Sequence, residues 1–298
     1  MKIYDCTLYY DEDLILEARL NILNQYIDKF IICEATFTHS GRKKKLNFDI
    51  NKFSKFKDKI IYTIQDTEPN TIIYEDLSKK IETPKNWRAN AVKRIAHQRN
   101  KLLDEVNHNA NSDDIILYSD NDEIPNLNNI DIFNEKSKIV IFEQDLYYYK
   151  FNLLCDRIKW YGTRAIKKKN LINFEWLRQI KPKKYPFYRF DTILKKDKYT
   201  NVKIVKDGGW HFTRIISPEE IHKKELDAEH HDEYRASNKN PDRIKDLIRR
   251  RMIDHDHLAD SREKKFGKEF PLIQVKINRM PEYIKNNQEK YLKFLDLY

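Results

Sequence analysis

Two aspartates follow an apolar run near the middle of the chain, in the segment Ser119-Asp120-Asn121-Asp122-Glu123. Asp120 and Asp122 are one residue apart, and carboxylate oxygens are ligands that Mg²⁺ and Mn²⁺ prefer. The pair could hold one divalent ion and leave coordination positions open for the oxygens of a bound diphosphate. Alternatively, these acids form a turn in which Asp122 or Asn126 caps the next helix.

A glycine pair lies in the segment Asp207-Gly208-Gly209-Trp210-His211, and the whole chain has only 5 glycines among 298 residues. Adjacent glycines in so glycine-poor a chain indicate a backbone that bends sharply or approaches another group closely. His211 could then complete the metal shell, and Trp210 could stack on a sugar or a base. A structural turn with a packed tryptophan and a hydrogen-bonded histidine explains the same residues.

Cationic and amide side chains gather between positions 87 and 106, where apolar residues at helical spacing predict a long helix. Arg94 and Gln98 share one face of this helix, and Arg99 follows directly. These groups could neutralise phosphates or recognise a base. A basic face turned to solvent is the alternative.

Histidines form a second group, in which His255 and His257 alternate with aspartates and are preceded by His230 and His231. Such a set is compatible with a metal-dependent phosphohydrolase. However, we place positions 255 and 257 at the end of a predicted helix, where side chains two positions apart point in different directions. A shared catalytic metal is therefore disfavoured there.

The order of predicted elements puts the acidic pair at one edge of a sheet. Helix and strand alternate over the first 140 residues, which is typical of an α/β fold with a mostly parallel central sheet and helices on both faces. Aromatic, β-rich segments then extend the sheet, and a C-terminal helical extension follows. Parallel sheets bind ligands at the carboxyl ends of their strands, where Asp120 and Asp122 are expected. The predicted helices span 13–28, 87–106, 218–228, 242–253 and 282–297, and the predicted strands span 30–33, 59–64, 115–118, 139–142, 146–151, 158–161 and 202–205.

The composition excludes several classes of protein. We expect no transmembrane segment, no glycine-rich nucleotide loop of the GxGxxG or GxxxxGK[ST] type, and no disulfide scaffold, because the chain has three widely spaced cysteines. The net charge of +10 would attract polyanions. It is spread along the chain and falls in no known nucleic-acid-binding pattern, so we expect no nucleic-acid partner.

Three segments, Phe30–Thr38, Ser119–Pro125 and Gly209–Phe212, together resemble glycosyltransferase family 17, and the resemblance extends to 217–221 and 280–284. The best-known member is the β-1,4-mannosyl-glycoprotein N-acetylglucosaminyltransferase that adds bisecting GlcNAc. The resemblance implies a GT-A-like, Rossmann-like fold and a nucleotide-sugar donor, UDP-GlcNAc in the best-known member. It also implies Mn²⁺ or Mg²⁺ as cofactor and inversion at the anomeric carbon. We expect a glycan or glycolipid as acceptor.

Individual residues match the family pattern. Asp120 and Asp122 match its DxD acids, and Trp210 and His211 match its Gly-Trp-His element. Glu34 matches an acid that ends an early strand, where donor contacts are expected.

The resemblance also divides the chain. We expect one GT-A-like catalytic domain over 1–298, with a nucleotide-sugar-binding half at 1–140, an acceptor-side half at 141–216 and a helical extension at 217–298. The stretch 150–206 matches the family poorly, and acceptor recognition is expected there. Golgi members carry an N-terminal membrane anchor that this sequence does not show, so we expect a cytoplasmic enzyme of microbial or viral origin.

An inverting transfer needs a base that takes the proton of the acceptor hydroxyl on the face opposite the leaving diphosphate. Glu143 and Asp145, just past the predicted strand 139–142, are the first candidates, and alternation puts both side chains on one face. Further candidates are Asp207, Glu175 and Asp191. The same acids would also suit a metal-dependent phosphohydrolase or nucleotidyltransferase, and the charge would suit a basic nucleic-acid-binding protein.

Overall fold

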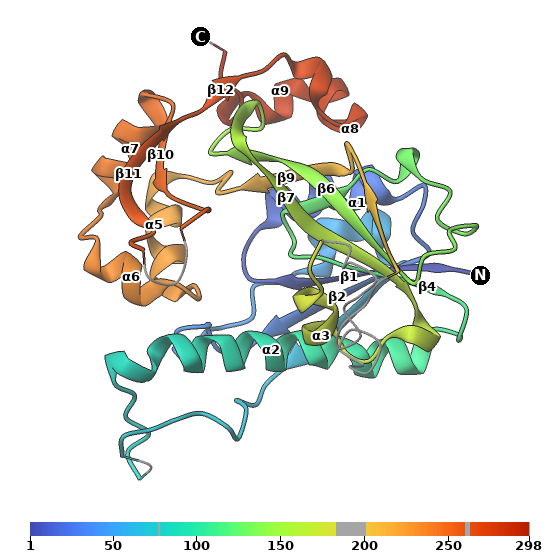
Figure 1. Ribbon diagram of the computed structural model, residues 1–298, viewed down its shortest axis with the longest axis horizontal. Coiled ribbons are helices and arrows are strands. Elements are labelled where there is room, and N and C mark those ends of the chain that lie inside the picture. The colour runs from blue at the N-terminus through green and yellow to red at the C-terminus, as the bar shows by residue number, and fades with distance from the viewer. Residues whose placement is uncertain (77, 183–200, 260–262, 298) are drawn as a thin grey trace, which may run out of the picture.

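The computed structural model describes residues 1–76, 78–182, 201–259 and 263–297, and its centre is a mixed sheet (Figure 1). The strand order is β3-β2-β1-β4-β7-β6-β9-β5, with β12 beside β7 and β8 beside β6. Within these residues, five of its nine strand pairings are parallel and four are antiparallel. The strands are β1 (Ile3–Tyr9), β2 (Lys29–Ala35), β3 (Ile60–Gln65), β4 (Ile115–Tyr118), β5 (Glu123–Pro125), β6 (Ile139–Tyr148), β7 (Leu153–Lys167), β8 (Val202–Val205), β9 (Gly209–Thr213) and β12 (Ile273–Gln274).

The parallel part of the sheet contains β1 to β4, with β1 between β2 and β4. β2, β3 and β4 match predicted strands, because each is a short and largely apolar run. β1 was not predicted from the sequence. Its buried Asp5 and Thr7 interrupt the apolar pattern, and burial of Asp5 depends on a partner from elsewhere in the chain.

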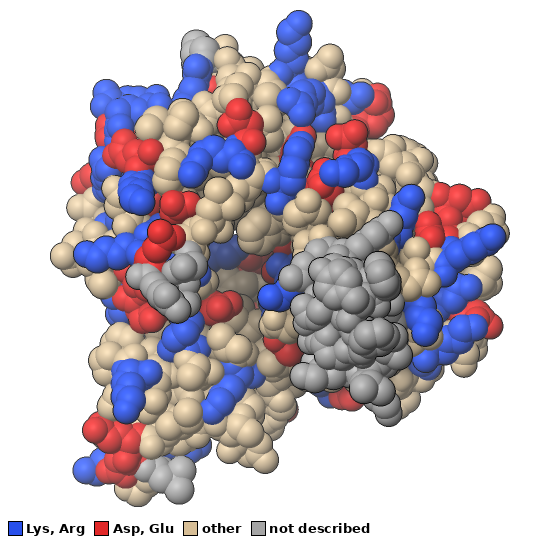
Figure 2. All heavy atoms as spheres, viewed as in Figure 1, with Lys and Arg blue, Asp and Glu red and all other residues tan. Residues whose placement is uncertain are grey.

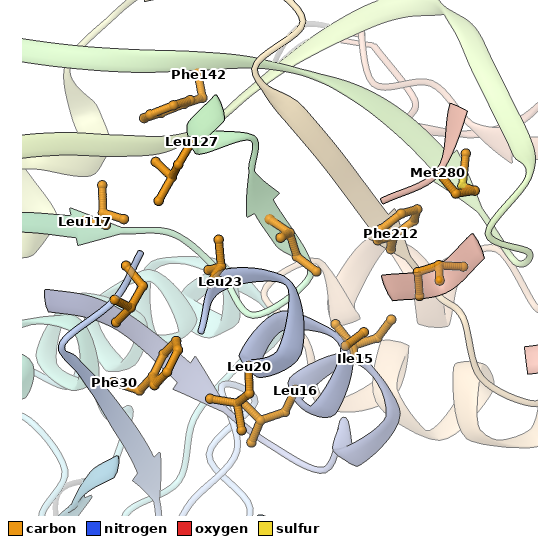
Figure 3. Close-up of a cluster of buried hydrophobic side chains, with 14 of the residues drawn as sticks. Ile15, Leu16, Leu20, Leu23, Phe30, Leu117, Leu127, Phe142, Phe212 and Met280 are labelled. Atoms are coloured by element: carbon orange, nitrogen blue, oxygen red, sulfur yellow. The ribbon is translucent and has the colours of Figure 1, made fainter. Parts of the chain in front are cut away.

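Helices cover both faces of the sheet, as predicted (Figure 1). On one face, α1 (Asp13–Leu23) buries Leu16, Leu20 and Leu23 in the larger core, which Figure 3 shows together with Phe30 of β2. On the other face, α2 (Pro84–Asn109) and α3 (Phe174–Gln179) pack over a second apolar cluster. The α/β architecture with helices on both faces is therefore confirmed, on a sheet that is mixed.

The C-terminal part of the chain forms two groups of short elements around the sheet. Figure 1 shows α5, α6 and α7 together with β10 and β11, and α8 and α9 near β12. The described residues contain no helix that is long and apolar enough to cross a membrane. The bounds are α5 (Pro218–Asp227), α6 (His231–Ala236), α7 (Pro241–Arg249), β10 (Met252–His255), β11 (Phe266–Pro271), α8 (Glu282–Asn286) and α9 (Gln288–Tyr291).

Three predicted helices end or break several residues before their predicted C-terminal ends. The predicted helix 13–28 ends at Leu23, because the chain must turn into β2, and the Asp28 carboxylate accepts a hydrogen bond from the Ile3 amide at 2.8 Å. The predicted helix 242–253 ends at Arg249 and is followed by β10. The predicted helix 282–297 breaks between α8 and α9, where Asn287 has a non-helical backbone.

Because α7 ends at Arg249, the predicted orientation of His255 and His257 has to be corrected. His255 lies at the end of a strand and not on a helix, and residues two positions apart in extended chain lie on the same side. The rings of His255 and His257 accordingly lie 4.2 Å apart, centroid to centroid. The prediction that they point in different directions was wrong.

Candidate functional site

A cavity of about 270 Å³ lies at the carboxyl ends of β1, β2 and β4. We call it the donor cavity, because a nucleotide-sugar donor is expected at this edge of the sheet from the sequence. The opposite wall comes from the end of α5 and the residues after it. Figure 2 shows the molecule hollowed near the middle of one face, with acidic and basic atoms on the walls. The charged side chains that line the donor cavity belong to Glu12, Lys44, Arg99, Asp120, Asp122, Lys224, Asp227 and Glu229.

The acidic segment after β4 is held in place by a buried arginine that the sequence analysis missed. Arg19 of α1 donates from Nη1 to the backbone oxygens of Asp120, Asn121 and Glu123 at 3.2, 3.2 and 2.9 Å. Its other nitrogens pair with Asp5 at 2.6 and 2.7 Å. The available signal was a charged residue at helical spacing on the apolar face of α1.

Asp120 is engaged by cations. Arg178 of α3 donates to its Oδ2 at 3.0 Å, and Arg99 Nη2 lies 3.7 Å from its Oδ1. Burial of this carboxyl favours its neutral form, but the charges of Arg178 and Arg99 outweigh burial and hold its pKa well below the ordinary value. Arg178 also bonds both Glu123 oxygens at 2.8 Å. Nothing in the local pattern around Arg178 predicted this role.

Asp122 pairs with His211, with 3.3 Å between Oδ2 and Nε2. Burial opposes charge on both groups, but each stabilises the charge of the other, so the pKa of Asp122 is lowered and that of His211 is raised. The His211 Nδ1 atom is buried and has no hydrogen-bond partner. These two side chains come from different elements, and the strand pairing of β5 with β9 brings them together.

The Asp122–His211 pair could serve a divalent metal. Two ligands on neighbouring corners of an octahedron around Mg²⁺ or Mn²⁺ lie about 3 Å apart, which is close to the observed separation. Asp120 was predicted as a further metal ligand, but its carboxylate is hydrogen-bonded to Arg178 instead of lying against the Asp122–His211 pair. Across the described ranges, no group of three or more Asp, Glu, His or Cys side chains comes together as a metal site. If a metal binds here, the described residues would supply two ligands, and the other ligands would come from substrate or water.

The residues predicted for substrate binding separate into two groups. Gln98 and Arg99 line the donor cavity, and Gln98 Nε2 donates to the Cys33 carbonyl at 3.1 Å. Arg94 and Glu34 do not line it. Arg94 is buried and bonds Glu68 at 2.5 Å, so it supports the adjoining loop.

Glu34 is fully enclosed by hydrogen-bond donors. Its two oxygens accept from Lys44, from the backbone amides of Asn47 and Phe48 at 2.8 and 3.1 Å, and from the Tyr62 hydroxyl at 2.8 Å. With these partners Glu34 anchors the segment after β2, and neither of its carboxylate oxygens is left to bind a nucleotide sugar.

Trp210 and the predicted bases lie away from the donor cavity. Trp210 precedes His211 in β9, so the two side chains point to opposite faces of the sheet. Asp145 is the strand neighbour of Trp210 and pairs with Lys159 and Arg279 at 2.5 and 3.0 Å. Glu143 accepts from Tyr161 and Lys206 at 2.8 and 2.9 Å.

None of these three side chains lines the donor cavity. Asp207 and Glu175 do not line it either, and Asp191 lies outside the described residues.

The glycine pair brings backbone segments together, and no ligand is needed to explain it. A Cβ on Gly209 would lie 2.2 Å from the Ile124 carbonyl oxygen, and the residue has a φ of +130°. Gly208 is similarly close to the Val205 carbonyl oxygen, at 2.7 Å. The expectation of a close approach is met by the contact between β9 and β5, which places His211 beside Asp122.

Comparison with protein families gives one match that covers the whole site. The model of glycosyltransferase family 17 matches residues 1–296. The chain belongs to glycosyltransferase family 17. No curated protein sequence is similar enough to count as a match.

Among solved structures, this family 17 glycosyltransferase matches the structure of the inositol-1-phosphate CTP transferase from T. maritima at 10% identity, with a TM-score of 0.33. The match covers 75% of this chain and 96% of the other.

Proposed function

We propose that this glycosyltransferase moves a sugar, with GlcNAc as the first candidate, from a UDP-sugar in the donor cavity to a hydroxyl of a glycan or glycolipid, with inversion. One observation carries the proposal: Arg99, Asp120 and Asp122 converge on a cavity at the carboxyl ends of β1, β2 and β4. In open α/β sheets, ligands bind in the crevice at this edge. Membership of family 17 supports the transfer of a glycosyl group.

Cations in the cavity wall would stabilise the diphosphate leaving group. Arg99 reaches the wall from α2 and Lys224 reaches it from α5. At present they neutralise acids, since Arg99 Nη1 bonds Glu175 at 2.8 Å and Lys224 pairs with Glu12. Charge-assisted hydrogen bonds from such groups are strongest where negative charge develops, which is at the oxygens of the departing UDP.

We propose Asp122 and His211 as the protein ligands of Mn²⁺ or Mg²⁺. When bound, the metal would act as a Lewis acid that neutralises charge on the diphosphate. Two protein ligands are compatible with this use, because Mg²⁺ commonly binds through one or two carboxylates and completes its shell with phosphates and water. Arg19 contributes by fixing the backbone that carries Asp122.

We propose Glu229, which no motif had indicated, as the acceptor-side base. The other acids in the cavity wall are each engaged by a basic side chain, as Glu12, Asp120, Asp122 and Asp227 are by Lys224, Arg178, His211 and Arg42. Glu229 is 38% exposed, and among the described residues its ion-pair partner is His230, with 3.8 Å between Nε2 and Oε1. Burial lowers the pKa of His230 and favours its neutral form. Because Glu229 has no strong cationic partner among the described residues, we propose its side chain as the group that takes the proton of the acceptor hydroxyl.

The test is a transfer assay with UDP-GlcNAc, Mn²⁺ and a set of glycan and glycolipid acceptors. Asp122→Asn should lower the transfer rate at least tenfold, and Mn²⁺ titration followed by electron paramagnetic resonance should show weaker binding. Asp104→Asn on α2 is the matched control, because that side chain is 56% exposed and its ion-pair partner among the described residues is the neighbouring Lys101. Unchanged Mn²⁺ affinity and an unchanged transfer rate in Asp122→Asn would show that Asp122 is not a metal ligand.

The products of the same assay separate the competing reactions. A glycosyltransferase yields UDP and a new glycoside in equal amounts. A phosphohydrolase would yield a sugar phosphate, and a nucleotidyltransferase would yield a nucleotidyl adduct. Either of these products in place of the glycoside would overturn the proposed function.

A further inference from the structure

A second cavity, of about 320 Å³, lies on the opposite side of β9 from His211, and we call it the amide cavity. The end of α1, the segment after β5, Trp210 and the start of α8 form its walls. Trp210 separates it from the site already described, because neighbouring residues of a strand face opposite sides of the sheet. A molecule in the amide cavity would therefore not contact the Asp122–His211 pair.

The walls of the amide cavity carry almost no charge. Of the thirteen described residues that line it, only Glu282 is charged, whereas 35% of the whole chain is charged. Five of the thirteen carry side-chain amides, four as asparagine and one as glutamine. Phosphates and divalent cations are bound by charged groups, so this lining suits a neutral ligand with many hydroxyl groups.

Several of these amides have hydrogen-bonding capacity to spare. Asn24 makes no side-chain hydrogen bond with any described residue, and the same holds for Nδ2 of Asn126 and Asn128. Tyr26 is fixed between two amides, since it accepts from Gln25 Nε2 at 2.9 Å and donates to the Asn128 oxygen. The cavity thus presents both free donors and free acceptors.

Aromatic rings complete the lining. Trp210 packs on the core and donates from its indole nitrogen to the Arg279 carbonyl at 2.9 Å, so its partly exposed ring is held in one orientation. Tyr283 at the start of α8 and Tyr26 add two more rings. A sugar ring has C–H groups on its faces and hydroxyl groups at its edge, and these match a rigid aromatic surface beside amide donors and acceptors.

We propose that the amide cavity binds a neutral oligosaccharide, as a site separate from the donor cavity. The inference rests on the wall chemistry and does not require the proposed transfer reaction. Because the two cavities open on different faces of β9, the sugar bound here would be a remote part of a long glycan or a separate molecule.

The experiment uses the full chain without UDP and two probes, chitotriose and mannotriose, with binding followed by saturation-transfer NMR and calorimetry. We expect millimolar or tighter binding of at least one trisaccharide. Asn24→Ala, which removes the free amide at a half-exposed position, and Asn128→Asp, which adds a charge to the neutral wall, should each weaken it about three- to tenfold. Asn278→Asp is the control, because that exposed side chain lies outside the cavity.

Weaker binding in either lining variant, with unchanged binding in Asn278→Asp and unchanged melting temperatures in all three, would support the proposal. No binding of either probe at about 10 mM, or equal affinity in all variants, would overturn it. Competition by UDP-GlcNAc, or loss of trisaccharide binding in Asp122→Asn, would also overturn it, because the sugar would then occupy the donor cavity. None of these results bears on whether the enzyme makes a glycoside.

Discussion

Arg19 and Asp5 form a fully buried ion pair, with 2.6 Å between Nη2 and Oδ1 and no exposed side-chain surface on either residue. The pair joins the middle of α1 to β1, and Arg19 Nη1 donates to the backbone that carries the acidic segment. Burial alone would disfavour the charged guanidinium, but Asp5 outweighs it and raises the pKa of Arg19. The position of Asp120 and Asp122 therefore depends on an interaction made beneath the cavity.

Replacing Arg19 should affect stability and donor binding separately. Arg19→Met leaves Asp5 buried without a partner and should lower the free energy of unfolding by about 3–5 kcal/mol. Arg19→Met combined with Asp5→Leu removes both charges and should recover most of that loss, as measured by urea unfolding. The acidic segment stays without its donors in both variants, so calorimetry should show weaker UDP binding in each. Parental UDP affinity in the double variant would show that Arg19 does not position this segment.

Glu229→Gln should lower the transfer rate about 10²- to 10⁴-fold, because an amide cannot take the proton of the acceptor hydroxyl. UDP-sugar affinity should stay near the parental value, since the proposed diphosphate contacts come from Arg99 and Lys224. Glu143→Gln and Asp145→Asn serve as comparisons and should retain the rate, because neither carboxyl lines the donor cavity. A rate loss confined to Glu143→Gln or Asp145→Asn would identify that carboxylate, and not Glu229, as the base.

The features that could be predicted from sequence are those set by local pattern. The apolar run Ile115–Tyr118 is stopped by acids and a proline, which was enough to place Asp120 and Asp122 at the carboxyl edge of the sheet. The helical spacing likewise predicted the helix α2, which carries Gln98 and Arg99 to the donor cavity. In both cases the information lies within a few residues of the site.

The features that could not be predicted depend on contacts between distant segments. Arg178 lies 58 positions from Asp120 and reaches it only because α3 packs beside α2. Glu229 became a candidate by elimination, once the partners of the other acids were visible. Trp210 and His211 were expected in one site because the segment was interpreted as a turn. If the segment Gly209–Thr213 had been interpreted as a strand, Trp210 and His211 would have been predicted on opposite faces of the sheet.

His257 should make the protein less stable in mild acid. Burial and the charge of Arg214 lower the pKa of His257 to about 3, whereas an unfolded chain titrates near 6.5. Between these values the unfolded chain binds more protons than the folded one, so the free energy of unfolding falls as pH falls below about 6.5. His257→Gln should reduce that slope by about 1.4 kcal/mol per pH unit.

Urea unfolding at about pH 7, 6 and 5 measures this slope. His108→Gln, at an exposed position on α2, controls for the change of residue type. An unchanged slope in His257→Gln would mean that another group accounts for any acid sensitivity. A stability that rises towards pH 5 would contradict the sign.

Gly209→Ala tests whether the glycine pair is needed to place His211. Gly209 and Gly267 both have a positive φ, of +130° and +112°, but a Cβ on Gly209 would meet the Ile124 oxygen at 2.2 Å and one on Gly267 would meet nothing within 4 Å. Backbone strain should cost about 1–3 kcal/mol at each position, and Gly209→Ala must in addition push β5 away from β9. We therefore expect Gly209→Ala to unfold at lower urea than Gly267→Ala and to bind Mn²⁺ more weakly, since the strand pairing brings His211 to Asp122. Equal stability and equal Mn²⁺ affinity in the two variants would show that the close approach is not what positions the histidine.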